Sequence, residues 1–136
     1  DEYGPASEDA ERLRQGLKLD HEKRKSHYSE LIEDNQLKGI FYMSERMRDL
    51  TLKFHEVLFI DATHKSNRFN LPLLDGAIIN NFGKTCTSFW ALIENQKQGS
   101  FEWALQQLKK HLKMDPKVII LDEEDALVNG KIISYY

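Results

Sequence analysis

Two apolar runs, each ending at a single aspartate, organise the hydrophobic pattern of this chain. Residues 57–60 are apolar and run directly into Asp61, and residues 118–121 do the same into Asp122. A continuous apolar run of this length is typical of a strand that is buried on both faces. Open α/β sheets usually hold their ligands at the C-terminal ends of such strands. If the two strands are parallel neighbours, both aspartates lie at the same edge of the sheet.

The segment between these runs predicts two further strands and a helix. Residues 70–80 and 85–93 are strand-like and flank a turn-type sequence, which indicates a hairpin. From Ser100 the apolar spacing changes to steps of three and four, which predicts an amphipathic helix that is capped by Ser100 and stopped by Pro116. If both strands that this helix joins lie in one sheet, they are expected to be parallel neighbours linked by a right-handed crossover.

Upstream, the pattern predicts a hairpin and a second helix. Residues 28–33 and 37–42 are strand-like and flank a turn-type sequence, Asp-Asn-Gln. Ser44 then resembles an N-cap, and the apolar residues that follow it fall at helical spacing. Three charged residues of this helix are expected to face solvent: Arg46, Arg48 and Asp49.

The first 26 residues are charged and poor in bulky apolar side chains, so they are expected to form a flexible arm or linker. Residues 8–17 within them have the composition of a short solvated helix. Residues 27–54 then form the lead-in hairpin and helix, and residues 55–136 form the main domain. A further helix is expected to begin at Asp125. The element order of that domain is then β-β-β-α-β-α with acids after the first and fourth strands, which predicts an α/β ribonuclease-H-like fold with a mixed sheet. That fold needs a further strand and helix, so the domain is expected to be incomplete at its C-terminus.

Composition narrows the class of protein. With 136 residues, 40% hydrophobic and 30% charged, the chain is expected to be one soluble domain. A net charge of −3 does not favour a strongly basic nucleic-acid reader, although it allows local basic patches. Cys86 is the only cysteine, which excludes an internal disulfide and indicates a reducing compartment. No apolar run is long enough for a bilayer and no leader is recognisable, so neither a membrane partner nor secretion is expected.

Three blocks of the sequence together resemble the Mutator-like-element (MULE) transposase domain, which also occurs in plant regulators of the far-red-impaired-response family. The blocks are FHEVLFIDATHKSNRFNLPLL, SFWALIENQKQGSFEWALQQL and PKVIILDEEDAL. The residues that match the family pattern are Asp61, Thr63, Asn67, Pro72, Leu73, Ala91, Leu92, Ser100, Phe101, Trp103, Asp122 and Ala126. The chain departs from the pattern at His64, where the family has Tyr, at Gln96, where it has an acid, and at Leu121, where it has Thr. The third catalytic acid of the family lies on a later helix that this sequence does not reach.

The resemblance implies that Asp61 and Asp122 are the first two acids of a D-D-E triad that binds Mg²⁺ or Mn²⁺. Two such ions about 4 Å apart stabilise the attacking and leaving oxygens of a phosphodiester reaction together. Lys65, Asn67 and Arg68 follow the first acid and are candidates for contacts with DNA phosphates, with a solvated loop as the plainer interpretation. The resemblance further implies transposon-end DNA as the partner, a nuclear location and a homo-oligomer.

Plainer roles are open for both aspartates. Asp61 can be a strand-end acid that is hydrogen-bonded to the following turn, for instance at Thr63, and Asp122 can be the N-cap of a following helix. The functional hypothesis is therefore a DDE-type transposase domain for DNA strand cleavage and transfer, truncated and inactive by itself. The alternative is a domesticated, non-catalytic, DNA-associated regulator or interaction module, so the enzymatic status is left open.

Overall fold

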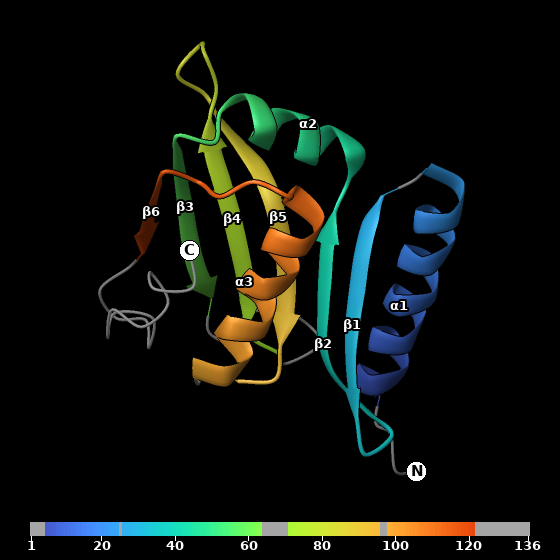
Figure 1. The fold of residues 1–136 in the computed structure, drawn as a ribbon. Helices are drawn as coiled ribbons and strands as arrows, with labels where there is room; N and C mark the ends of the chain where they lie inside the picture. The colour runs from blue at the N-terminus through green and yellow to red at the C-terminus, as the bar shows by residue number, and fades with distance from the viewer. Residues whose placement is uncertain (1–4, 25, 64–70, 96–97, 122–136) are drawn as a thin grey trace.

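A computed structural model describes residues 5–24, 26–63, 71–95 and 98–121. These residues form one sheet with the strand order β1-β2-β5-β4-β3-β6 and three helices (Figure 1). The strands are β1 (His27–Glu33), β2 (Gln36–Met43), β3 (Val57–Thr63), β4 (Leu73–Ile79), β5 (Thr85–Ile93) and β6 (Val118–Leu121). The helices are α1 (Pro5–Arg24), α2 (Glu45–Lys53) and α3 (Gln98–Leu112).

The sheet is mixed, as the sequence predicts. β6 pairs with β3 in parallel, and the other described pairs are antiparallel. The α3 crossover joins the parallel strands β5 and β6, but these are not neighbours as expected, because β4 and β3 lie between them. β4 and β5 form the predicted hairpin. The upstream hairpin pairs with β5 through β2 and so extends the same sheet.

One face of the sheet packs against α3 and forms the main core. Leu58 and Ile60 of β3 are buried on this face, and the apolar stripe of α3 covers them. The members of that stripe are Phe101, Ala104, Leu105, Leu108 and Leu112. In β3 the alternation of burial places Asp61 on the other face, where it is exposed.

The expectation of strands buried on both faces is wrong for this part of the sheet. In β6, Val118 and Ile120 expose 49% and 45% of their surface. Val57 and Phe59 of β3 are also only partly buried. The reason is that α3 covers one face of these strands, whereas no described element covers the other face. Successive side chains of a strand therefore alternate between buried and exposed positions.

Helix α1 replaces the flexible arm expected for residues 1–26, over the part of it that is described. Leu13 and Leu17, four residues apart, pack against Ile40 and Leu92 on the face of the sheet opposite α3. The Arg14 guanidinium donates to both carboxylate oxygens of Glu30 on β1, at 2.6 and 2.8 Å. The sequence did not predict this docked helix, because two leucines are a weak signal for a buried helix face. The ion pair to β1 joins segments that are distant in sequence, so composition does not reveal it.

Helix α2 begins as predicted, but one of its arginines does not face solvent. The backbone N–H of Met47 donates to Ser44 Oγ at 3.1 Å, which confirms the N-cap. Arg46 and Asp49 are exposed, whereas Arg48 Nε donates to the carbonyl oxygen of His111 at 2.8 Å. Carbonyl groups in the last turn of a helix lack intrahelical partners, and Arg48 satisfies one of them in α3.

The start of α3 differs from the prediction. The helix begins at Gln98, so Ser100 lies in its first turn and is not the N-cap. Ser100 Oγ instead donates to Asn95 Oδ1, at 3.2 Å. Among the described helices, none is both long and apolar enough to cross a membrane.

Candidate functional site

Asp61 lies near the end of β3 on the face opposite α3. The strand registers set it in a row across the sheet, with Asp75 of β4, Trp90 of β5 and Tyr42 of β2 as successive neighbours. Residues that are opposite each other in adjacent strands share a face. Asp61 is exposed, so its carboxylate is open to a ligand from this face.

Asp75 is the acid that lies beside Asp61 in the described structure, and sequence reasoning missed it. The two are direct partners across the antiparallel β3–β4 ladder. The pKa of Asp75 is raised above its ordinary value, first because surrounding protein shields the carboxyl group from water and then because Asp61 is negative. The alternation of residues 73–79 predicts that Asp75 and Leu74 lie on opposite faces of the sheet. No local sequence pattern predicts that Asp75 is the partner of Asp61.

The strand that leads to Asp122 lies where the sequence predicts. β6 runs parallel to β3, and the register pairs Val118 with Val57 and Leu121 with Ile60. Each strand thus reaches the residue before its aspartate at the same level of the sheet. Asp122 itself lies outside the described residues, as do the three candidates for phosphate contact, Lys65, Asn67 and Arg68.

The donor set on this face suits a hard cation. Mg²⁺ prefers carboxylate oxygens and keeps several of its waters, so it needs few protein ligands. Asp61 and Asp75 present two carboxylates side by side at an open surface. Within the described ranges, no group of three or more His, Cys, Asp or Glu side chains is placed to hold a metal ion.

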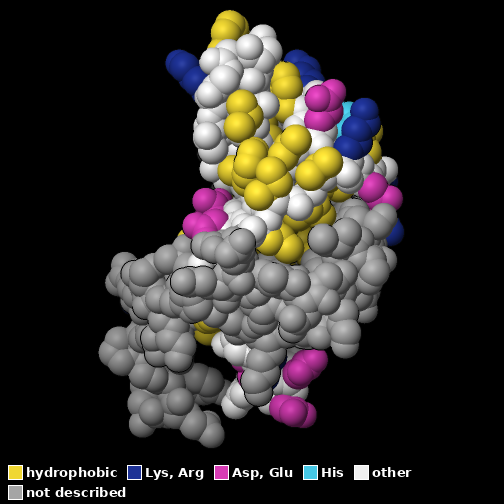
Figure 2. Space-filling model, turned by 90° about the vertical axis from the view of Figure 1, so that its left-hand side faces the viewer, with side chains coloured by type: hydrophobic (Ala, Val, Ile, Leu, Met, Phe, Trp, Pro, Cys, Tyr) yellow, Lys and Arg dark blue, Asp and Glu magenta, His cyan; other side chains and the backbone are white. Residues whose placement is uncertain are grey.

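Figure 2 shows exposed apolar side chains on the side of the molecule where β6 forms the edge of the sheet. In β6, Val118 and Ile120 are exposed, and the register with β3 sets them on the same face as Asp61. A hollow of about 410 Å³ lies at the opposite end of β3 from Asp61, where Val57, Phe59 and Ile79 line it together with Lys53, Phe54 and Glu56. Asp61 thus lies on a face that combines exposed apolar surface with acidic groups.

Comparison with known proteins identifies the family. The model of the family described as "Zinc finger SWIM domain-containing protein 1/3, RNaseH-like domain" matches residues 15–125. No solved structure matches the chain.

Three proteins of Arabidopsis thaliana are each 26% identical to the chain. Protein FAR1-RELATED SEQUENCE 6 aligns over 90 residues, which is 66% of this chain and 13% of that protein. Protein FAR1-RELATED SEQUENCE 5 aligns over 105 residues, 76% of this chain and 13% of its own length. Protein FAR-RED IMPAIRED RESPONSE 1 aligns over 102 residues, 74% of this chain and 12% of its own. The chain thus spans about an eighth of the length of these relatives.

The family match covers all six described strands together with α2 and α3, and it agrees with the mixed, ribonuclease-H-like topology. It also confirms the resemblance to MULE-type transposases. The chain belongs to the ribonuclease-H-like domain family of zinc finger SWIM domain-containing proteins 1 and 3, and is a MULE-like, transposase-related domain.

Proposed function

We propose that this domain carries part of a DDE-type site for DNA strand cleavage and transfer, in which Asp61 and Asp122 hold Mg²⁺ or Mn²⁺. The observation that carries the proposal is the parallel register of β3 and β6. Ile60 and Leu121 are partners in that register, and each is followed in the sequence by one of the two aspartates. Parallel strands end at the same edge of a sheet, so the register supports a shared position for the two acids.

The role of each residue follows from its position. When bound, the metal ions supply charge that stabilises the attacking and leaving oxygens of the phosphodiester. Asp61 and Asp122 hold these ions at the sheet edge. Asp75 adds negative charge beside Asp61, which strengthens the attraction of a cation to this face. DDE chemistry also requires a third carboxylate, which this proposal does not assign.

The partner in this proposal is DNA, as transposon ends. Lys65, Asn67 and Arg68 follow β3 in the sequence and contact phosphates beside the metal ions. The location is nuclear, and the assembly that acts on two DNA ends is a homo-oligomer. The family relationship to transposase-related proteins supports each of these points.

A second candidate function is a non-catalytic, DNA-associated regulator or interaction module. Leu121 favours it, because the MULE pattern has Thr at this position and the leucine here packs against the main core. A residue that serves packing next to the second acid is compatible with a domain that has kept its fold and lost its chemistry. Gln96, at a position where the pattern has an acid, favours the same function.

Metal binding separates the two functions. Mn²⁺ is titrated into the wild-type chain and into the variants Asp61→Asn and Asp122→Asn, and the bound ion is followed by electron paramagnetic resonance. Asp49→Asn is the matched control, since Asp49 is an exposed aspartate on α2. The proposal predicts that each site variant weakens Mn²⁺ binding at least about tenfold while the control leaves it unchanged. Equal binding by all four proteins, or no binding by any, rejects the metal site and favours the regulator.

A further inference from the structure

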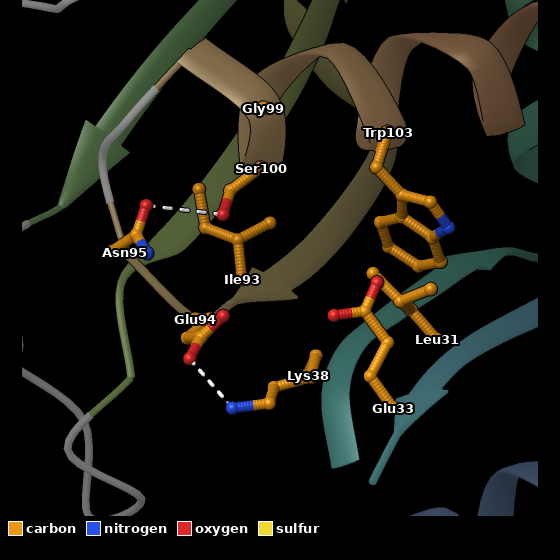
Figure 3. A pocket seen from close by; sticks show the side chains of 9 residues that line it. All are labelled: Leu31, Glu33, Lys38, Ile93, Glu94, Asn95, Gly99, Ser100 and Trp103. Carbon is orange, nitrogen blue, oxygen red and sulfur yellow. Dashed lines mark hydrogen bonds and ion pairs between the residues drawn. The ribbon is translucent and has the colours of Figure 1, made fainter. Parts of the chain in front are cut away.

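A cavity of about 380 Å³ lies between the β1–β2 hairpin, the end of β5 and the first turns of α3 (Figure 3). Its apolar wall consists of Leu31, Ile93 and Trp103, and its charged rim consists of Glu33, Lys38 and Glu94. Ile93 and Trp103 belong to the core on the α3 side of the sheet, whereas Asp61 lies on the other side. The cavity is therefore separate from the proposed metal site.

Trp103 is fixed in the cavity wall by a glycine. A Cβ atom at Gly39 of β2 would lie 2.8 Å from the six-membered ring of the indole, closer than carbon atoms normally approach. The indole thus lies directly against the backbone of β2, and only glycine leaves room for it. Trp103 is not fully buried and lines the cavity, so part of this rigid aromatic surface is open to a ligand.

The charges on the rim do not cancel. Lys38 Nζ lies 2.8 Å from Glu94 Oε1, and the pKa of Lys38 is raised, first by this hydrogen bond and further by the negative charges of Glu33 and Asp34. The positive charge of Lys38 is therefore balanced by Glu94. Glu33 has no ion-pair partner among the described residues, and its carboxylate points into the cavity beside Trp103 (Figure 3). The rim keeps a net negative charge.

We propose that this cavity binds a basic side chain of a partner polypeptide, and arginine in preference to lysine. A basic side chain joins an apolar stem to a cationic head, which matches a wall of Trp103 and Leu31 that ends at a free carboxylate. A guanidinium group stacks on an aromatic ring and makes two parallel hydrogen bonds to a carboxylate, whereas an ammonium group does so less well. An anionic ligand is disfavoured, because the one lysine of the rim is already held by Glu94.

The probe is the tripeptide acetyl-Gly-Arg-Gly-amide, compared with the same peptide containing citrulline, which keeps the shape but carries no charge. Binding is followed through the indole N–H resonance of Trp103 in ¹H–¹⁵N NMR spectra, with Trp90→Phe used to assign it. The arginine peptide should shift this resonance with a dissociation constant in the millimolar range or below. The citrulline peptide should bind at least about tenfold more weakly, because it lacks the charge-assisted hydrogen bonds to Glu33.

Two variants test the role of Glu33. Glu33→Gln should lower the affinity for the arginine peptide at least about tenfold. The matched control, Glu56→Gln, removes the same charge from an exposed glutamate that precedes β3, at the other end of the sheet, and should leave affinity unchanged. Both glutamates are exposed, so both variants should keep the wild-type NMR spectrum elsewhere.

Several results would overturn the proposal. Equal binding of the arginine and citrulline peptides would show that charge is not recognised. An equal loss of affinity in Glu33→Gln and Glu56→Gln would show that the peptide responds to the net charge of the protein and not to Glu33. Tighter binding of a lysine peptide would reject the preference for arginine, and a shift of the Trp103 resonance by inorganic phosphate alone would identify an anion site instead.

Discussion

Asp61 and Asp75 lie directly opposite each other on the antiparallel β3–β4 ladder, on the face of the sheet that α3 does not cover. Two carboxylates in this relationship repel each other, and the raised pKa of Asp75 reflects part of that repulsion. The arrangement costs stability in the absence of a cation. A cation at the proposed site would offset this repulsion.

Asp75→Asn should raise the free energy of unfolding by roughly 0.2–1 kcal/mol at pH 7 without divalent ions, because it removes a like charge directly opposite Asp61. Urea denaturation in a chelating buffer measures the change. In an Asp61→Asn background the same substitution should stabilise the domain less, because only the cost of shielding the Asp75 carboxylate from water is then removed. A gain of equal size in both backgrounds would show that the benefit comes from Asp75 alone and not from the pair.

Gly76→Ala should destabilise the domain by about 1–3 kcal/mol or more, since the new Cβ would lie 2.2 Å from the ring of the fully buried Phe89. Gly16→Ala is the matched control. Gly16 lies within α1, and beyond its chain neighbours and the nearby backbone of that helix no described atom lies within 4 Å of the added carbon, so alanine there should stabilise the domain by up to about 1 kcal/mol. Thermal unfolding of the two variants should shift in opposite directions, and equal shifts would contradict the close contact at Gly76.

His111 should make the domain less stable in mild acid. Its pKa is lowered to about 4, first by burial and then by the positive charges of His27, Lys110, His21 and Arg48. The unfolded chain takes up a proton near pH 6.5 while the folded chain resists it, so the free energy of unfolding should fall as the pH drops from about 6.5 to about 4. His111→Gln should flatten this slope in denaturation measured at several pH values. An unchanged slope would show that other groups cause the loss.

Glu30→Gln should loosen α1 from the sheet, with a loss of roughly 1–2 kcal/mol, because the amide keeps only one of the two oxygens that accept from the Arg14 guanidinium and carries no charge. Glu11→Gln is the control: Glu11 meets the same guanidinium at 3.2 Å from within α1, so its loss should be smaller and should leave the docking intact. Hydrogen exchange of the α1 amides distinguishes the two. Faster exchange to the same degree in both variants would contradict a specific role for Glu30.

Glu30 also gives this contact a pH dependence at lower pH than His111. Its pKa is lowered to about 2, chiefly by the hydrogen bond from Arg14. A carboxylate with a depressed pKa contributes its full stability above the ordinary value of about 4.5 and loses it as the pH falls toward 2. In Glu30→Gln this acid-induced loss should be absent, while the loss between pH 6.5 and 4 should persist.

Local patterns predicted much of the fold. Turn-type residues between strand-like segments predicted both hairpins, Ser44 predicted the start of α2, and the change of period near Ser100 predicted a helix that joins parallel strands. These signals are local because turns, caps and amphipathic stripes depend on residues within a few positions of each other. For the same reason the cap assigned to Ser100 was wrong, since the helix begins two residues earlier.

The candidate site was only partly predictable. Asp61 and the strand leading to Asp122 were identified from apolar runs that end at an acid, and the structure places that strand parallel to β3. Asp75 was missed because its pairing with Asp61 depends on the register between β3 and β4, which no local sequence pattern gives. The docking of α1 and the exposure of Val118 and Ile120 depend on which face each helix covers.

The sequence by itself determined the order of the elements from β1 to β6, the family and the two aspartates that follow apolar runs, because spacing along the chain encodes secondary structure and motif. Only the tertiary structure decided which acid lies beside Asp61, which face of the sheet is open, and that Trp103 and Glu33 line one cavity. Those facts depend on contacts between segments that are distant in sequence, and such contacts are set by the packing of the whole domain.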